Sequence, residues 1–255
     1  MNPIIGMHGI GMQGMPTLEI CVDDAEGLHS AAMTGPARIE LCSALDLGGL
    51  TPGYGLVQQA RSCAVPVFAM IRPRPGNFCF TAREEAQMLA DIALMRDSGL
   101  AGVVLGAAHP DHTLDLRMLE RLSAACGPMR RQLHRVVDLA PDPFAALDAA
   151  IALGFERVLS SGQASDAVKG AARLKAMHDY AEERIEIMAG SGVRPGNVVA
   201  LMRETGVRAV HASCRKRIAM QDERLVHFGF AASNAVTSAA EINQLLVAMA
   251  SMQRG

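Results

Sequence analysis

The sequence predicts a single α/β domain with the fold of a (β/α)8 barrel. Short apolar strand patterns alternate with helical patterns, and this unit recurs eight times with the spacing of βαβ crossovers. No shift in composition marks a linker or a domain boundary. Eight such units in 255 residues match a (β/α)8 barrel. A doubly wound open sheet is the alternative, but no GxGxxG motif follows the first strand.

Each predicted strand is a short apolar run that ends at a turn or at a polar residue. In order along the chain, the predicted strands are Thr17–Val22, Arg38–Leu41, Pro66–Ile71, Gly102–Leu105, Arg131–Asp138, Arg157–Ser160, Ile185–Ala189 and Ala209–Ser213.

A helix is predicted after each strand. Thr81 and Glu84 have the spacing of a capping box, and Thr51-Pro52 predicts an N-cap followed by proline at the first helical position. A long polar loop is expected before the closing helix. The predicted helices are Asp23–Thr34, Thr51–Cys63, Thr81–Ser98, Asp115–Cys126, Asp142–Leu153, Ser165–Ala181, Pro195–Glu204 and Thr237–Met249.

Composition and charge exclude several classes of partner. A formal net charge of -2 argues against non-specific binding to nucleic acid, which requires a basic face. No apolar run approaches the roughly 20 residues of a membrane span. Residues 1–16 lack the positive and apolar regions of a signal peptide. We expect them to form a flexible, dispensable extension, followed by one domain over residues 17–255.

The cysteines indicate a reducing compartment. Six of them are scattered through the chain without paired CxxC spacing. In a chain of this length without a secretory signal, they are expected to be free thiols rather than a disulfide framework. The sequence therefore predicts a soluble, cytoplasmic protein.

Polar residues gather where the predicted strands end, which is where (β/α)8 barrels carry their function. By the two-residue periodicity of strands, Cys21, Cys42 and Met70 share a face with their polar neighbours. The structural alternative is a buried salt-bridge layer, Glu19–Arg72–Glu40, that fills the barrel. The polar residues at the strand ends are Glu19, Glu40, Arg72, Arg74, His134, Asp138, Ser161, Gln163, Ser191, His211 and Ser213.

A glycine-rich turn predicts an anion site at the same end of the barrel. Gly190, Ser191, Gly192 and Val193 lie between the seventh strand and the start of the next predicted helix. Backbone N–H groups and the helix dipole favour an anion at such a place, and in barrels this region often binds phosphate. Further donors are expected from the neighbouring strand end, at Ser161, Gly162 and Gln163, and from Arg72 after the third strand.

With these segments in view, the chain resembles the copper homeostasis protein CutC family. The most specific segments are IELC…GGLTP and IRPR. In order along the chain, the matching segments are LEICVDD (18–24), RIELCSALDLGGLTPGYG (38–55), VFAMIRPRPGNF (67–78), LHRVVD (133–138), RVLSSGQASDA (157–167), IMAGSGVRPGNV (187–198) and AVHAS (209–213).

The resemblance implies a cytosolic (β/α)8 barrel that self-associates and is linked to copper handling. It implies copper-binding thiols at Cys21 and Cys42. It also implies a polar barrel mouth that comprises Glu19, Glu40, Arg72, Arg74, His134, Arg135, Asp138 and His211.

Two function hypotheses follow, with an interaction scaffold as the third. The first is copper homeostasis, with Cu(I) at Cys21, Cys42 and Met70, because soft sulfur ligands select that ion. The second is a lyase, aldolase or isomerase that acts on a small anionic or phosphorylated metabolite and uses Glu40 or His134 to move protons. No lysine lies at the strand ends, which argues against a Schiff-base aldolase.

Overall fold

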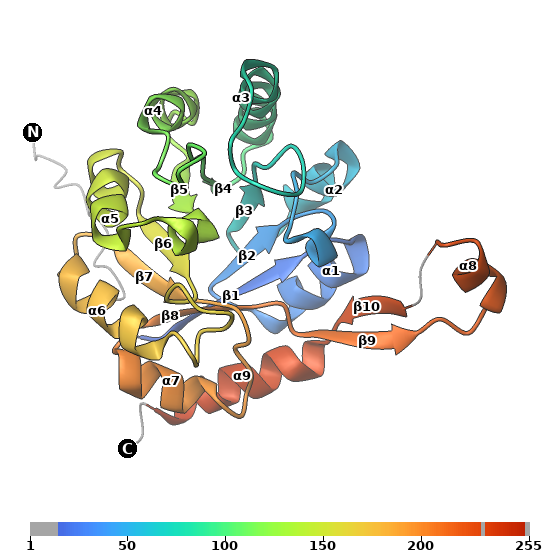
Figure 1. The fold of residues 1–255 in the computed structure, drawn as a ribbon. Coiled ribbons are helices and arrows are strands. Elements are labelled where there is room, and N and C mark those ends of the chain that lie inside the picture. Colours follow the sequence, from blue (N-terminus) through green and yellow to red (C-terminus); the bar gives the residue numbers. More distant parts are fainter. Residues whose placement is uncertain (1–14, 231–232, 253–255) are drawn as a thin grey trace, which may run out of the picture.

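Eight parallel strands close into a barrel in the computed structural model, which describes residues 15–230 and 233–252. Each strand pairs with the next in the chain, and β8 pairs with β1 to close the ring (Figure 1). The predicted (β/α)8 fold is therefore confirmed, whereas the expectation for residues 1–14 lies outside the described residues. The strands are β1 Thr17–Val22, β2 Arg38–Leu41, β3 Val67–Met70, β4 Gly102–Leu105, β5 Arg130–Leu133, β6 Arg157–Ser160, β7 Glu186–Ala189 and β8 Ala209–Ala212.

Helices surround the barrel and cover its outer face (Figure 1). Asp24 caps α1, and the predicted capping box of Thr81 and Glu84 starts α3. No helix among the described residues is long and apolar enough to cross a membrane. The barrel helices are α1 Ala25–Thr34, α2 Tyr54–Ala60, α3 Ala82–Asp97, α4 Leu116–Ala125, α5 Pro143–Ala152, α6 Ala171–Ala181, α7 Val198–Thr205 and α9 Ala239–Ser251.

The strand register places the polar residues inside the barrel. Glu19 lies opposite Arg38 on β2 and opposite His211 on β8, and Cys21 lies opposite Glu40. Paired residues of parallel strands share one face of the sheet, so these five side chains point inward. The intervening apolar residues face the helices and belong to the main hydrophobic core. The predicted strand periodicity is confirmed here.

A charged layer fills the barrel below its mouth, but its members differ from the predicted ones. Glu19 is fully buried and forms ion pairs with Arg38 at 3.7 Å and Arg157 at 4.0 Å. Gln132 donates a hydrogen bond to Glu19. Arg72 instead donates to three backbone carbonyls. The prediction that Arg72 pairs with Glu19 inside the barrel is therefore wrong, because Arg38 and Arg157 take that place.

Two local predictions fail because polar side chains bond to the backbone. The predicted strand Arg131–Asp138 ends early, since a 3₁₀ helix follows over Arg135–Leu139. The His134 ring accepts the Val136 N–H and caps that helix. Thr51 does not cap a helix either: its hydroxyl accepts the backbone N–H of Arg72, and α2 begins only at Tyr54.

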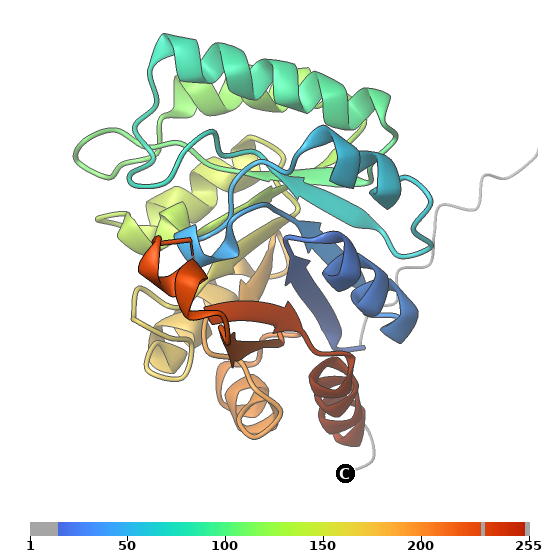
Figure 2. The same cartoon turned by 90° about the vertical axis from the view of Figure 1, so that its right-hand side faces the viewer.

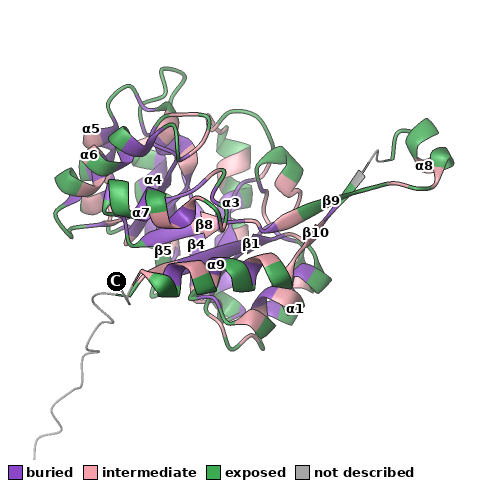
Figure 3. Ribbon diagram, turned by 90° about the horizontal axis from the view of Figure 1, so that it is seen from below, coloured by how far each residue is buried: buried purple, intermediate pink, exposed green. Residues whose placement is uncertain are grey.

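An arm stands where a polar loop was predicted before the closing helix. Strands β9 (Arg215–Ala219) and β10 (Ser233–Thr237) form an antiparallel pair, with the short helix α8 (Glu223–His227) near the far end. Figure 1 shows the arm reaching away from the barrel, and Figure 2 shows it from the front. Its far end is largely exposed (Figure 3). Arg215 and Arg217 at its base line the barrel mouth.

Candidate functional site

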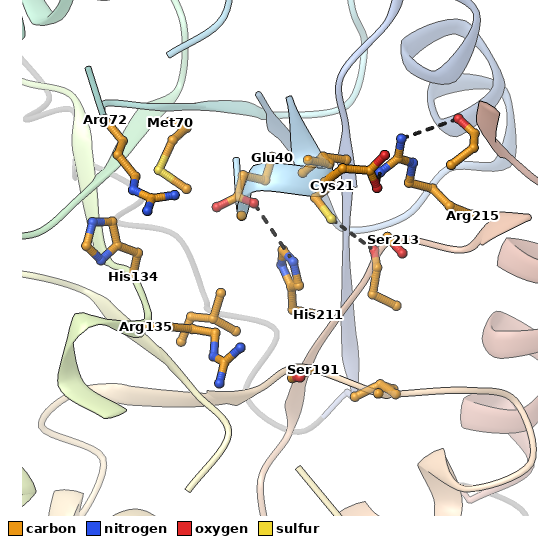
Figure 4. Close-up of a pocket in the computed structure, with 18 of the residues that line it drawn as sticks. Cys21, Glu40, Met70, Arg72, His134, Arg135, Ser191, His211, Ser213 and Arg215 are labelled. Carbon is orange, nitrogen blue, oxygen red and sulfur yellow. Dashed lines mark hydrogen bonds and ion pairs between the residues drawn. The ribbon is translucent and has the colours of Figure 1, made fainter. Parts of the chain in front are cut away.

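A cavity of about 400 Å³ opens at the carboxyl ends of the barrel strands. Figure 4 shows side chains from β1, β2, β3 and β8 converging on it, together with residues of the loops that follow β5 and β7. The polar and sulfur-containing side chains that line the cavity are Cys21, Glu40, Asp46, Met70, Arg72, His134, Arg135, Ser191, Arg194, His211, Ser213, Arg215 and Arg217.

Two buried carboxylates hold the ring of His211 between them. Nδ1 of His211 lies 2.8 Å from Oε1 of Glu19, and Nε2 lies 3.8 Å from Oε2 of Glu40. Glu19 lies on the barrel side of this row, where it also meets the arginines of the charged layer. Glu40 lies on the cavity side. Glu19, His211 and Glu40 therefore form a continuous row of contacts from the barrel interior to the cavity.

Burial and charge separate the pKa values of the two carboxylates. Burial alone would raise the pKa of Glu19, but the hydrogen bond and charge of His211, with Arg157 and Arg38, lower it below its usual value. Burial raises the pKa of Glu40 to about 7, with a further contribution from the nearby Glu19 charge. Glu40 is therefore the carboxyl that can gain or lose a proton near neutral pH.

The His211 imidazole favours its protonated form. Burial alone would lower the pKa of His211, but the Cys21 thiol and the carboxylates of Glu19 and Glu40 raise it well above its usual value. A protonated ring donates from both nitrogens, which matches a carboxylate on either side. The ring can therefore relay charge between the carboxylates.

The two predicted thiols occupy different surroundings. Cys21, Glu40 and His211 each offer a ligand atom, and these three atoms lie within 4.8 Å of one another. Cys42 is not a member of that group; its thiol donates to Glu40 at 3.6 Å. Burial, with the nearby Glu40 carboxylate, raises the pKa of Cys42 well above its usual value. The two thiols therefore do not form one matched pair of ligands.

Arg72 and His134 present unpaired polar atoms on another side of the cavity. Both side chains are more than nine-tenths buried, and within the part of the chain that the structure describes, neither Nε of Arg72 nor Nε2 of His134 has a hydrogen-bond partner. The Phe78 ring stacks against His134 and lies under Arg72. Both groups are therefore held in place by packing while one polar atom of each stays free.

Asp138 lies outside the cavity lining and holds neighbouring groups in place. Its carboxylate accepts from the hydroxyls of Ser160 and Ser161, from the backbone N–H groups of Ser161 and Gln163, and from the side chain of Arg135. The predicted donors at 161–163 are thus already used, and Gly162 donates to Ser160. We therefore correct the predicted anion site: this segment binds the protein's own carboxylate.

The other half of the predicted anion site does reach the cavity. Ser191, Gly192 and Val193 line it, and Ser191 and Gly192 adopt left-handed backbone angles, with φ of 74° and 75°. Gly190 donates its N–H to Ser160. Helix α7 begins at Val198 rather than at Pro195, so its N-terminus lies farther along the chain than predicted.

One arginine predicted at the barrel mouth lies outside the cavity, and three arginines that line the cavity were not predicted there. Arg74 binds Glu84 and Asn77 and does not line the cavity. Arg194, Arg215 and Arg217 do line it. Arg215 and Arg217 lie two residues apart in the basic run RKR (215–217), so on a strand they share one face, and this signal could have identified the last two.

A closed (β/α)8 barrel with a polar cavity at the carboxyl ends of its strands defines the class of this protein. The chain belongs to the CutC family, whose model matches residues 16–216. It is 50% identical over 196 residues to a CutC family protein of Caulobacter vibrioides, covering 77% of this chain and 80% of the relative. It is 44% identical over 241 residues to one from Agrobacterium fabrum, covering 93% and 96%.

Solved structures agree with this assignment. The CutC protein of Streptococcus agalactiae, whose name links it to copper homeostasis, matches with a TM-score of 0.74 and 32% identity, over 77% of this chain and 98% of that one. A phosphoribosylanthranilate isomerase from Thermotoga maritima matches with a TM-score of 0.57 and 11% identity, over 93% and 100%. The second likeness shows the shared barrel fold alone.

Proposed function

We propose that the cavity is the active site of an enzyme that moves a proton on a small anionic metabolite. Three buried polar atoms of its lining carry this proposal, because none of them has a hydrogen-bond partner in residues 15–230 and 233–252: Oε1 of Glu40, Nε of Arg72 and Nε2 of His134. Leaving a buried polar group unpaired costs about 1–3 kcal/mol. A ligand that pairs with all three atoms would recover that free energy.

His134 supplies a neutral N–H donor. Burial, with the nearby Arg72 charge, lowers the pKa of His134 to about 3, so the ring is neutral at physiological pH. Its Nδ1 accepts the Val136 N–H, and a neutral imidazole has one accepting and one donating nitrogen. Nε2 therefore carries the hydrogen and points it at the ligand, where it can polarise a carbonyl.

Arg72 supplies the positive charge that selects an anion. Among the described residues its other nitrogens bond only to carbonyls, those of Leu47, Gly49 and Gly76, so no carboxylate neutralises it. Four more arginines line the cavity, and each of them pairs with a carboxylate: Arg135 with Asp138, Arg194 with Glu241, Arg215 with Asp23 and Asp46, and Arg217 with Asp46. A phosphate or carboxylate on the ligand would therefore pair with Arg72.

Glu40 supplies the base. A base works best when its pKa lies near the working pH, and the pKa of Glu40 is about 7. His211 adjoins Glu40 and can pass charge to Glu19. No lysine of the described residues lines the cavity, so the proton is moved without a Schiff base. The reaction type is an isomerisation or a retro-aldol cleavage of a carbonyl compound.

Proton exchange tests this proposal. The protein is incubated in D₂O with small phosphorylated and carboxylated carbonyl compounds, and deuterium incorporation is followed by NMR. We expect incorporation next to the carbonyl of at least one compound, and a loss of about 100-fold or more in Glu40→Gln. Arg74→Ala is the matched control, because Arg74 lies outside the cavity. Exchange at the wild-type rate in Glu40→Gln would overturn the assigned base.

Copper handling in the cytoplasm is the second candidate function, supported by the family and by the name of the Streptococcus agalactiae relative. Cys21 and Met70 line the cavity, and thiolate and thioether ligands suit Cu(I). The fit is partial, because both thiols would have to lose the protons that they donate, Cys21 to the Ala212 carbonyl and Cys42 to Glu40. A competition titration with a Cu(I) chelator tests it: equal affinity in the wild type and in the double variant Cys21→Ser/Cys42→Ser ends this candidate.

A further inference from the structure

Three ligand atoms of different chemistry converge beside the cavity. The Cys21 thiol, a Glu40 carboxylate oxygen and a His211 ring nitrogen lie within 4.8 Å of one another. They come from β1, β2 and β8, which are adjacent around the barrel. Oε1 of Glu40 is buried and has no hydrogen-bond partner among the residues that the structure describes. We propose that Cys21, Glu40 and His211 form a site for Zn²⁺, which shares Cys21 with the predicted two-thiol copper site but does not use Cys42.

His211 is already oriented as a metal ligand. Metal-binding histidines donate their second ring N–H to a carboxylate or carbonyl, which fixes the ring and its tautomer. Nδ1 of His211 makes this contact with Glu19 at 2.8 Å, which leaves Nε2 on the Glu40 side. Glu19 is itself held by Gln132 and by Arg38. The supporting contacts of a metal site therefore exist before any ion binds, and zinc would displace the protons carried by Nε2 of His211 and by the Cys21 thiol, because both ligand atoms must be deprotonated.

The distances between the three ligand atoms need little adjustment to bind zinc. Tetrahedral zinc binds sulfur at about 2.3 Å and nitrogen or oxygen at about 2.0–2.2 Å, so its ligand atoms lie about 3.5 Å apart. Nε2 of His211 and Oε2 of Glu40 are 3.8 Å apart. Small side-chain rotations would bring Cys21 to the same spacing. Three protein ligands leave a fourth position, which would face the cavity as in catalytic zinc sites.

The donor set favours Zn²⁺ over other ions. Mg²⁺ and Ca²⁺ prefer oxygen ligands alone, and low-coordinate Cu(I) prefers sulfur. One sulfur, one nitrogen and one oxygen match zinc, which accepts all three. The two sites also differ in their dependence on Cys42: the copper candidate needs its thiol, whereas the zinc site does not include it.

Zinc and the proposed proton transfer would compete for Glu40. As a metal ligand, Glu40 cannot also accept a proton from a substrate. The metal-free protein is then the form with a free base, and zinc would act as an inhibitor of it. The zinc site does not require the proton transfer to exist, and its test uses no substrate.

Cobalt spectroscopy and zinc competition test the site. Chelator-treated protein in a reducing buffer is titrated with Co²⁺, whose thiolate complexes show a charge-transfer band in the near ultraviolet. We expect this band in the wild type and in the matched control Cys42→Ser, and its loss in Cys21→Ser. With a chromophoric zinc chelator, Glu19→Gln should weaken zinc binding by about 10–100-fold, and His211→Asn should weaken it further.

Several outcomes would overturn the proposal. One is the absence of the band in the wild type, and another is its loss in Cys42→Ser as fully as in Cys21→Ser. Circular dichroism and the melting temperature confirm that each variant folds, and Cys21→Ala replaces Cys21→Ser should the latter fail to fold. Arg72→Ala should keep the zinc affinity of the wild type, which separates this site from the anion site.

Discussion

Glu19 and His211 lie opposite each other on β1 and β8, and the contact between them, 2.8 Å from Oε1 to Nδ1, joins the charged interior of the barrel to its mouth. On one side of the contact, Arg38 and Arg157 surround Glu19. On the other, His211 adjoins Glu40. A change at Glu19 should therefore affect both the stability of the barrel and the chemistry of the cavity.

Glu19→Gln should lower the free energy of unfolding by about 3–5 kcal/mol, the cost of removing one partner from a buried ion-pair network. Urea denaturation measures the loss. Asp179→Asn is the control, because Asp179 pairs with Lys175 on the exposed surface and such pairs contribute at most about 1 kcal/mol. A similar small loss in both variants would show that the network contributes little to stability.

Glu40→Gln should stabilise the protein in a pH-dependent way. The pKa of Glu40 is about 7 in the folded protein, above its ordinary value of 4.5. The folded state therefore binds this proton more tightly than the unfolded state does. Protonation of Glu40 stabilises the folded protein fully below pH 4.5, and this contribution is lost as the pH rises through 7. Glutamine stays neutral throughout, so it avoids the cost of burying a charge.

Urea denaturation of metal-free protein between pH 5 and pH 8 measures this effect. The advantage of the glutamine variant should grow with pH and reach at most about 3 kcal/mol. Glu120→Gln on the exposed face of α4 should show no such trend, since that side chain is solvated in both states. A difference in the free energy of unfolding between Glu40→Gln and the wild type that stays constant with pH would contradict the assigned pKa.

Gly106→Ala should displace His134. A Cβ at this position would lie 2.5 Å from Cε1 and 2.7 Å from Nδ1 of the His134 ring, and overpacking a buried site costs about 1–3 kcal/mol. Gly196→Ala is the control, because its Cβ meets no atom within 4 Å. The first variant should lose stability and anion binding, measured by denaturation and calorimetry. Equal anion affinity in both variants would show that the ring position is unimportant.

The sequence was sufficient to predict the barrel and the inward side chains, because strand periodicity and the βα rhythm are local patterns. Competing hydrogen bonds were harder to predict. The His134 side chain ends β5 by bonding to the Val136 N–H, and Asp138 occupies the N–H groups that an external anion was expected to use. Both hydrogen-bond patterns depend on the direction in which a side chain points, and the spacing of residues in the sequence does not determine that direction.

The ion-pair partners of the arginines could not be predicted from the sequence either. Arg38 and Arg157, rather than Arg72, neutralise Glu19, because the ring of strands sets which side chains meet inside the barrel. Arg215 and Arg217 enter the cavity from an arm that sequence reasoning described as a loop. Such partners lie far apart in the chain, and only the closed register of the barrel brings them together.

Phosphate binding to the wild type, Arg72→Ala and Arg74→Ala tests the central claim most directly, with the melting temperature and calorimetry as readouts. Arg72 lines the cavity with a free Nε, whereas Arg74, two residues later, binds Glu84 outside it. We expect phosphate to protect the wild type and Arg74→Ala equally. Arg72→Ala should bind about tenfold more weakly or worse, since hydrogen bonds to charged groups contribute about 1.5–3 kcal/mol. No protection of the wild type, or equal protection of Arg72→Ala, would contradict an anion site at the barrel mouth.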